Sequence, residues 1–163
     1  MLTPENLGKI SAVFTSRMAM RPLTSWLPVN EAAEPESIFQ LQRFDIRNYY
    51  FLPSMPGFNS YLPVPHGKYM FVILTTSPGQ IYCGAPWDSW AASQQFIPPV
   101  SNHAALAGTL KVLFAGELEF SRGELIQWSN NSGHFMPDVR DLFSNTLPVV
   151  RRLLPLERFR EIM

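Results

Sequence analysis

The middle of the chain carries the hydrophobic pattern of β-strands. Residues 68–75 form a nearly continuous apolar run, a Ser-Pro-Gly turn follows, and residues 80–83 return as a short apolar segment, which predicts a β-hairpin. A longer hairpin is predicted from residues 110–120 and 124–129, joined by a three-residue Ser-Arg-Gly loop whose glycine suits a left-handed backbone. We therefore expect a central antiparallel sheet built from two β-hairpins.

Helical spacing is found toward the two ends of the chain. Residues 1–37 form a lead-in that begins with a Thr-Pro-Glu helix start, and Pro137 precedes a predicted helix that Pro148 ends. A last helix is expected from Pro155, with inward-facing apolar residues Leu156, Phe159 and Ile162. The expected fold class is α+β with short helices at both ends. Residues 1–163 would form a single domain, in which the lead-in 1–37 precedes a sheet core over 38–131 and C-terminal helices over 136–163.

A proline- and aromatic-rich loop interrupts the β-pattern. Residues 53–65 contain four prolines together with the aromatic residues Phe58 and Tyr61. Proline fixes φ and lacks an amide donor, so this segment is not a central strand. Such a rigid loop with aromatic side chains is a candidate surface for binding a partner protein.

Composition and charge narrow the classes of function. With 46% hydrophobic residues the chain can bury a core, and this excludes disorder. Lys plus Arg and Asp plus Glu both number 13, so no excess of cations is present to neutralise nucleic-acid phosphates. The single Cys83 cannot form an internal disulfide, and no spacing typical of a metal site occurs, so we expect no metal.

The sequence predicts neither a membrane span nor a secretion signal. The longest apolar run covers only residues 69–74, far less than the roughly 20 residues that cross a bilayer. The first residues lack the basic and apolar regions of a signal peptide. We expect a monomer or weak dimer that is cytoplasmic, or that is exported into a target cell without a Sec-type signal.

Two histidines and two glutamates are associated with the longer predicted hairpin. His103 precedes the hairpin and His134 follows it, so the imidazoles could flank one end of the sheet and divide acid and base roles. Glu117 and Glu119 alternate along one strand and so project from the same face. Gly116 permits a bulge or a close approach beside Glu117, which favours Glu117 as the functional carboxylate. A structural interpretation stays open, in which the histidines bond the backbone and the glutamates lie on a solvated face.

The order of three short motifs resembles one class of ADP-ribosyltransferases. Arg43 and Arg47 come first, Thr75-Thr-Ser77 follows, and Glu117-Leu-Glu119 is last. In that class an arginine holds the phosphate of the dinucleotide, and the last glutamate stabilises the positive ribosyl centre. The resemblance implies NAD as a substrate and Arg47 as a substrate-binding residue.

A second resemblance extends over much of the C-terminal half. The motifs His103-Ala-Ala-Leu-Ala-Gly108, Leu113-Phe-Ala-Gly-Glu117 and Asn131-Ser-Gly-His-Phe-Met-Pro137 resemble a C-terminal module of bacterial polymorphic-toxin and effector proteins. Ala104 and Ala105 stand where the module has hydroxyl residues, and Phe135 stands where it has tyrosine. The resemblance implies a secreted effector, toxin or virulence context without specifying a reaction.

These observations predict an effector- or toxin-type domain that acts by transfer or hydrolysis on a nucleotide-like or protein substrate of a host or competitor cell. ADP-ribosyl transfer is the leading activity. The expected site contains the catalytic residues His103, Glu117 and His134 and the substrate-binding residues Asn131, Ser132 and Arg47. The alternative function is a non-catalytic protein-binding module that uses the loop 53–65.

Overall fold

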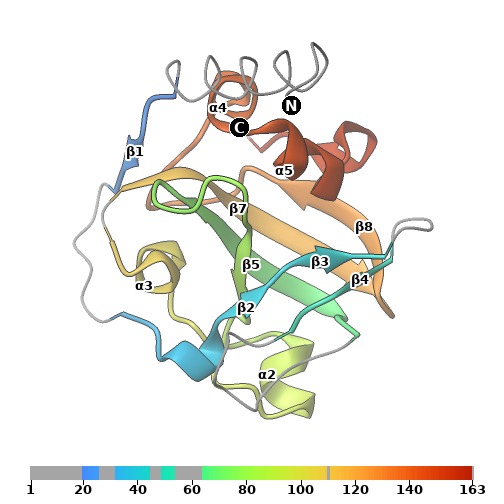
Figure 1. Cartoon of the computed structure of the whole chain (residues 1–163). Coiled ribbons are helices and arrows are strands. Elements are labelled where there is room, and N and C mark those ends of the chain that lie inside the picture. The colour runs from blue at the N-terminus through green and yellow to red at the C-terminus, as the bar shows by residue number, and fades with distance from the viewer. Residues whose placement is uncertain (1–19, 26–31, 45–48, 54–63, 110, 163) are drawn as a thin grey trace, which may run out of the picture.

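The computed structural model describes residues 20–25, 32–44, 49–53, 64–109 and 111–162. In these residues a mostly antiparallel sheet is combined with four α-helices, so the expected mixture of helices and antiparallel strands is present (Figure 1). The expected N-terminal helix, Arg47 and most of the loop 53–65, with Phe58 and Tyr61, lie outside the described residues. No described helix is long and apolar enough to cross a membrane.

The main sheet has the strand order β2-β6-β5-β7-β8-β9, and β1 also pairs with β7. Its strands are β1 (Leu23–Thr24), β2 (Phe39–Gln40), β5 (Gly67–Leu74), β6 (Tyr82–Gly84), β7 (Lys111–Ser121), β8 (Glu124–Ser129) and β9 (Phe159–Arg160). Strands β5 to β8 form its centre, but β1, β2 and the parallel strand β9 come from outside the predicted hairpins. Two hairpins are therefore an incomplete description of the sheet.

A second, two-stranded sheet and the helices surround the main sheet. The small sheet pairs β3 (Gln42–Arg43) with β4 (Tyr50–Phe51). The helices are α2 (Trp90–Gln94), α3 (His103–Ala107), α4 (Val139–Asn145) and α5 (Pro148–Leu153), with 3-10 turns η1 (Pro35–Ser37) and η2 (Leu156–Arg158). Figure 1 shows α4 and α5 above the sheet, α2 below it and α3 at the left.

The turn between β7 and β8 is tighter than predicted. The strands are joined by Arg122 and Gly123 alone, and both residues have positive φ, 48° and 90°. Positive φ at both central residues is the signature of a two-residue hairpin turn, for which the predicted glycine is well suited. The irregularity in strand pairing lies between Glu119 and Phe120 and not at Gly116.

The C-terminal prediction is partly wrong. The helix after Pro137 is present as α4, and its capping box joins Asp138 and Asp141. Pro148, however, begins α5 at a position where the missing amide is harmless, and Pro155 is followed by the short 3-10 turn η2 where an α-helix was expected. The chain instead extends as β9 along β8, because an edge strand offers unpaired backbone groups. The predicted inward residues Leu156 and Ile162 are therefore 48% and 43% exposed.

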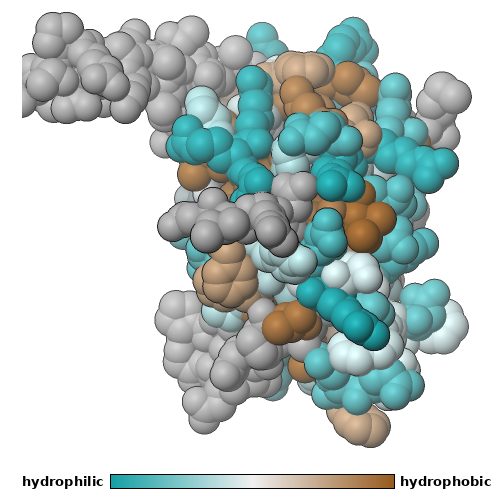
Figure 2. Space-filling view, turned by 90° about the vertical axis from the view of Figure 1, so that its right-hand side faces the viewer, coloured by the Kyte–Doolittle hydropathy of each residue, from teal (hydrophilic) through white to brown (hydrophobic). Residues whose placement is uncertain are grey.

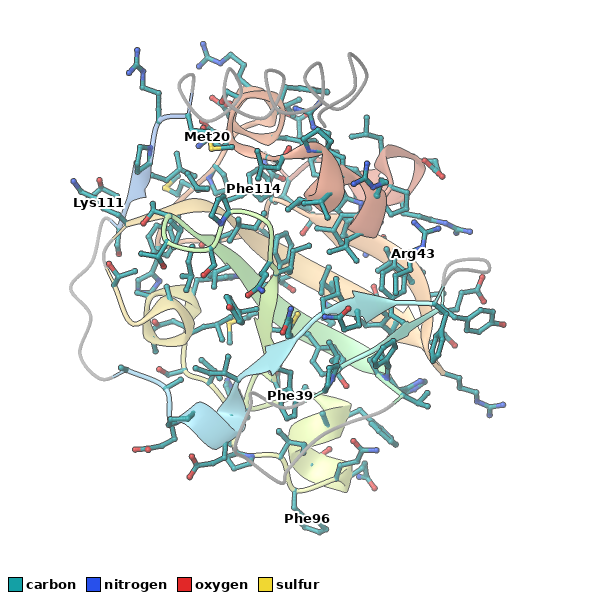
Figure 3. The ribbon with its side chains drawn as sticks, viewed as in Figure 1. Met20, Phe39, Arg43, Phe96, Lys111 and Phe114 are labelled. Atoms are coloured by element: carbon teal, nitrogen blue, oxygen red, sulfur yellow. The ribbon has the colours of Figure 1, made fainter. Side chains whose placement is uncertain are left out.

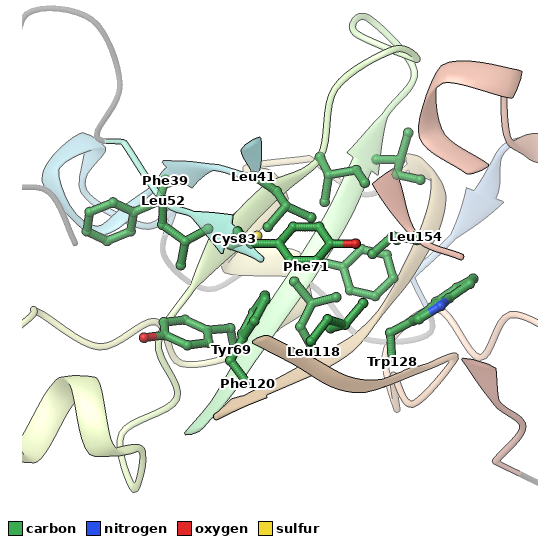
Figure 4. Close-up of a cluster of buried hydrophobic side chains, with 14 of the residues drawn as sticks. Phe39, Leu41, Leu52, Tyr69, Phe71, Cys83, Leu118, Phe120, Trp128 and Leu154 are labelled. Carbon is green, nitrogen blue, oxygen red and sulfur yellow. The ribbon is translucent and has the colours of Figure 1, made fainter. Parts of the chain in front are cut away.

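The two faces of the sheet are buried by different elements. One face carries a large aromatic core in which Phe71, Phe114 and Trp128 contact one another, as the close-up in Figure 4 illustrates for part of the cluster. Cys83 is fully buried in this core, and burial raises the pKa of its thiol, so it is an inert packing residue. The other face packs a smaller cluster against α3. This second face also carries Glu117.

Candidate functional site

His103 is a buried histidine whose ring bonds the backbone. It is the first residue of α3, where the side chain of Asn102 accepts a bond from the Ala105 amide at 2.8 Å. The imidazole is 6% exposed, and its Nε2 lies 2.7 Å from the Gly116 carbonyl oxygen. Because a carbonyl only accepts, Nε2 carries the proton. Burial lowers the pKa of His103 to about 4, so the ring is neutral near pH 7.

Gly116 lies at a stretch of β7 where regular strand pairing on one side is interrupted. Strand β1 pairs with residues 111 and 112, and β8 pairs from Glu117 onward. Between them, Asn145 Nδ2 donates to the Leu113 carbonyl at 2.9 Å, and His103 donates to the Gly116 carbonyl. A Cβ at position 116 would lie 1.8 Å from the Ser129 carbonyl oxygen, so only glycine allows this approach. The predicted close approach is therefore observed at Gly116, without a bulge.

Glu117 and Glu119 share a partly solvated face. In the sheet register they lie opposite Met70 and Lys68 of β5. Each carboxylate accepts a bond from an amide side chain, Glu117 from Asn131 and Glu119 from Gln127, the latter at 3.0 Å. Both line a hollow of about 90 Å³, together with Lys68, Gln127, Ser129, Asn131, Arg160 and Ile162. The two glutamates are thus brought together as predicted, at a shallow polar surface.

The loop after β8 is held by its own polar side chains. Asn130 is buried; its Nδ2 donates to the Pro137 carbonyl at 2.8 Å, and its Oδ1 accepts from the Ile162 amide at 2.7 Å. The hydroxyl of Ser132 accepts from the Phe135 amide at 3.3 Å. Of the two predicted substrate-binding residues in this loop, Ser132 is buried in a local turn, and Asn131 is exposed beside Glu117.

The two histidines are close, but neither lines a described hollow. His134 is half-buried, and its charge is near enough to contribute to the lowered pKa of His103. A second hollow of about 350 Å³ next to the loop is lined by Asn130–Gly133, Met136–Asp138, Glu161 and Ile162. Neither imidazole lines this hollow or the one over Glu117. The predicted acid-base pair is therefore near the polar surface without facing a described cavity.

The motifs that resemble an ADP-ribosyltransferase do not converge. Glu117 lies opposite Met70, whereas Thr75 follows the other end of β5 five residues later, roughly 16 Å along the strand. Arg43 lies over the ring of Tyr50, which belongs to the aromatic core on the opposite face from Met70. Arg47, the predicted phosphate-binding residue, lies outside the described residues.

Three residues that depart from the effector-module pattern pack together. Ala104, Ala105 and Phe135 all belong to the buried cluster between α3 and the sheet. Where that pattern has hydroxyl groups, this chain therefore has apolar packing. Within the described residues, no group of three or more histidine, cysteine or acidic side chains could hold a metal ion.

The structure also reveals an exposed aromatic surface that the sequence pattern did not identify. Trp87 and Phe96 are 76% and 85% exposed, and Trp90, between them in the chain, is 39% exposed. The ring of His66 contacts Trp90 edge-on at 5.1 Å between centroids. We call His66, Trp87, Trp90 and Phe96, which lie in or against the segment that contains α2, the α2 aromatic surface. An abundance of Trp and Phe predicts that these residues are buried in the core, and this is correct for Trp128. For Trp87, the polar residues beside it in the sequence were the one sign of an exposed position.

No family model matches this chain, and neither a curated protein nor a solved structure does.

Proposed function

We propose that this chain is a protein-binding module of the effector type that its sequence resembles, and that it binds through the α2 aromatic surface. The observation that carries the proposal is the outward placement of Phe96, which is 85% exposed at a backbone φ of 55°. Large aromatic side chains are enriched at the centres of protein interfaces, where their burial supplies much of the binding energy.

The backbone at Phe96 supports a functional role because it is unfavourable for the fold. Phe96 follows α2, in the position after the C-cap Gln95 where a left-handed residue is usually glycine. A bulky residue there costs about 1–2 kcal/mol. Neighbouring amides hold the geometry, since Gln95 and Ile97 both donate to the Ala91 carbonyl, at 3.1 and 3.2 Å. A glycine would adopt the same backbone conformation at lower cost, and the exposed ring of Phe96 adds little buried area to the fold.

The charge of the segment around α2 favours a protein partner. Between residues 86 and 97 the charged side chain is Asp88, and no lysine or arginine is present. A stacking surface for nucleic acid would need cations for the phosphates. An apolar partner surface gains from burying Trp87 and Phe96 without any such charge.

Binding can be tested with peptides displayed on phage and selected on the folded chain. The affinity of the selected peptides is then measured by fluorescence anisotropy for Trp87→Ser, Phe96→Gly and the control Ile126→Thr. Ile126 is 42% exposed on β8, so the control also removes an exposed apolar group. We expect about tenfold weaker binding for each of the first two variants and no change for the control, because hot-spot aromatics dominate affinity.

A different result would contradict this assignment. If selected peptides bind Trp87→Ser and Phe96→Gly as tightly as the unchanged chain, or if Ile126→Thr weakens binding equally, the α2 aromatic surface is not the binding site. Selection that yields no specific peptide also counts against a peptide-binding module.

A catalytic function at Glu117 and Glu119 is the second candidate. Its support is that both carboxylates lie in one polar hollow, where Asn131 and Gln127 orient them. Glycohydrolase or transferase activity on NAD would appear as nicotinamide release. We expect Glu117→Gln to abolish such release and Glu119→Gln to reduce it less. No nicotinamide release by the unchanged chain, with NAD alone and with protein acceptors, would reject this candidate.

A further inference from the structure

A groove between α5 and the β3–β4 ribbon combines arginines with apolar side chains. It has a volume of about 440 Å³ and is lined by Arg43, Phe44, Val149, Arg151, Arg152 and Leu153. No carboxylate is among these described lining residues. Figure 2, which views the molecule from the right of Figure 1, shows hydrophilic side chains at the upper level with hydrophobic ones among them.

The groove is preformed because hydrogen bonds fix both of its walls. The Tyr50 hydroxyl donates to the Leu153 carbonyl at 2.5 Å, and Arg43 Nη1 donates to the Arg152 carbonyl at 2.6 Å. Arg151 donates to the Thr146 hydroxyl at 3.0 Å and to the Phe143 carbonyl at 2.5 Å. These contacts tie the end of α5 to β3, β4 and α4. Both groups that accept from Arg151 are uncharged, so these hydrogen bonds do not neutralise the positive charge of Arg151 at the groove.

The charges around the groove are strongly unbalanced. Arg151 and Arg152 line the groove, and Arg158 and Glu157 are close enough to affect the Tyr50 hydroxyl, so these three arginines, leaving Arg43 aside, meet one glutamate among the described residues. Burial raises the pKa of Tyr50 to about 12, so its phenol adds no negative charge near pH 7. Arginines in the last turn of α5 also suit the helix dipole, but that does not explain the apolar floor.

The apolar side chains on the floor of the groove favour a peptide ligand over a simple anion. Phe44 is 54% exposed, with its ring 4.8 Å from that of Phe51, and Val149 is 38% exposed. A phosphate would use the arginines and leave these apolar groups in water. A peptide that carries both acidic and apolar side chains would satisfy both, because Arg pairs with carboxylates and buried apolar area adds affinity.

We propose that this groove binds an acidic, apolar-containing segment of a partner protein. The site is separate from the α2 aromatic surface and does not depend on it; Figure 3 labels Arg43 on the right-hand side of the molecule and Phe96 at the bottom. The groove is therefore a second contact region, selected by charge.

The test uses a fluorescein-labelled peptide of about ten residues in which glutamate alternates with leucine and phenylalanine, and a matched peptide with lysine in place of glutamate. Binding is measured by anisotropy to the full chain, to Arg152→Glu and to the control Lys111→Glu. The control makes the same change in net charge at an exposed position on β7, at the opposite side of the view in Figure 3. We expect the acidic peptide to bind, the basic one not to bind, and Arg152→Glu to weaken binding about tenfold while Lys111→Glu does not.

Two further measurements complete the experiment. Phe44→Ala should weaken the acidic peptide several-fold, and inorganic phosphate at equal ionic strength should not displace the peptide more than chloride does. Unchanged thermal unfolding of Arg152→Glu would show that the exposed substitution leaves the fold intact. Equal weakening by Arg152→Glu and Lys111→Glu would overturn the proposal, because binding would then follow net charge alone. Specific displacement by phosphate, or indifference to Phe44→Ala, would overturn it in favour of a small-anion site.

Discussion

The region around β7 and the α2 aromatic surface differ in how far their polar and aromatic side chains are engaged in contacts within the fold. Around β7 the side chains of catalytic type are committed to the fold: His103 bonds the Gly116 carbonyl, Asn130 bonds Pro137, and Ser132 closes a turn. On the α2 aromatic surface, by contrast, Trp87 and Phe96 are held in water, and Phe96 sits on an unfavourable backbone. His103, Asn130 and Ser132 therefore have structural partners, whereas the side chains of Trp87 and Phe96 are left largely exposed.

The largest effect expected in the β7 region comes from Gly116→Ala. The added Cβ would lie 1.8 Å from the Ser129 carbonyl oxygen and 2.9 Å from the Phe71 ring, so β7 and β8 would have to separate. We expect a loss of more than about 3 kcal/mol in the free energy of unfolding, measured by urea denaturation. Gly133→Ala is the matched control, because no atom lies within 4 Å of its added Cβ. A loss below about 1 kcal/mol at position 116 would show that this contact is soft.

A smaller, pH-dependent effect is expected from His103. Its pKa is about 4 in the folded chain against 6.5 in the reference state, so the unfolded chain binds more protons between these pH values. This residue's contribution is fully present above pH 6.5 and is lost as the pH falls toward 4, by about 3 kcal/mol at most. The measurement is urea denaturation at several pH values for the unchanged chain and for His103→Gln, which should lack this part of the slope. Parallel slopes for the two proteins would argue against a buried, neutral His103.

The β-strands were predictable from the sequence because their signals are local. The apolar run before Ser77 and the alternation around Glu117 place β5, β7 and β8 within a residue or so of their observed bounds. The end of the chain was not predictable in this way. Phe159 follows a helical spacing, yet β9 forms because Trp128 Nε1 donates to the Pro155 carbonyl at 2.7 Å and β8 offers a free edge. Such long-range pairing leaves no periodic pattern in the segment that pairs.

At the candidate site, too, the features set by local residue spacing were predictable, and those set by contacts between distant segments were not. The period-two spacing of Glu117 and Glu119 correctly places both on one face, and the neighbouring loop contributes Asn131 beside them. The burial of His103 could not be inferred, because it depends on where α3 packs against β7. The basic groove is a similar case, since β3 and α5 are separated by about a hundred residues of chain. Single-sequence patterns identify neither contact.

The smallest expected effect has the opposite sign and comes from the α2 aromatic surface. Phe96→Gly removes the steric cost of a positive φ without exposing core, since the Phe96 side chain is already 85% exposed. Glycine after a helix C-cap is favoured, so we expect a gain of up to about 1 kcal/mol in the free energy of unfolding, reduced by the greater backbone freedom of glycine in the unfolded chain. The control Phe96→Ala keeps the strain but removes the ring, and should leave stability nearly unchanged. Urea denaturation of both variants checks this. If Phe96→Gly instead destabilises the chain by more than about 1 kcal/mol, the ring contributes to the fold, and its exposure no longer indicates a binding surface.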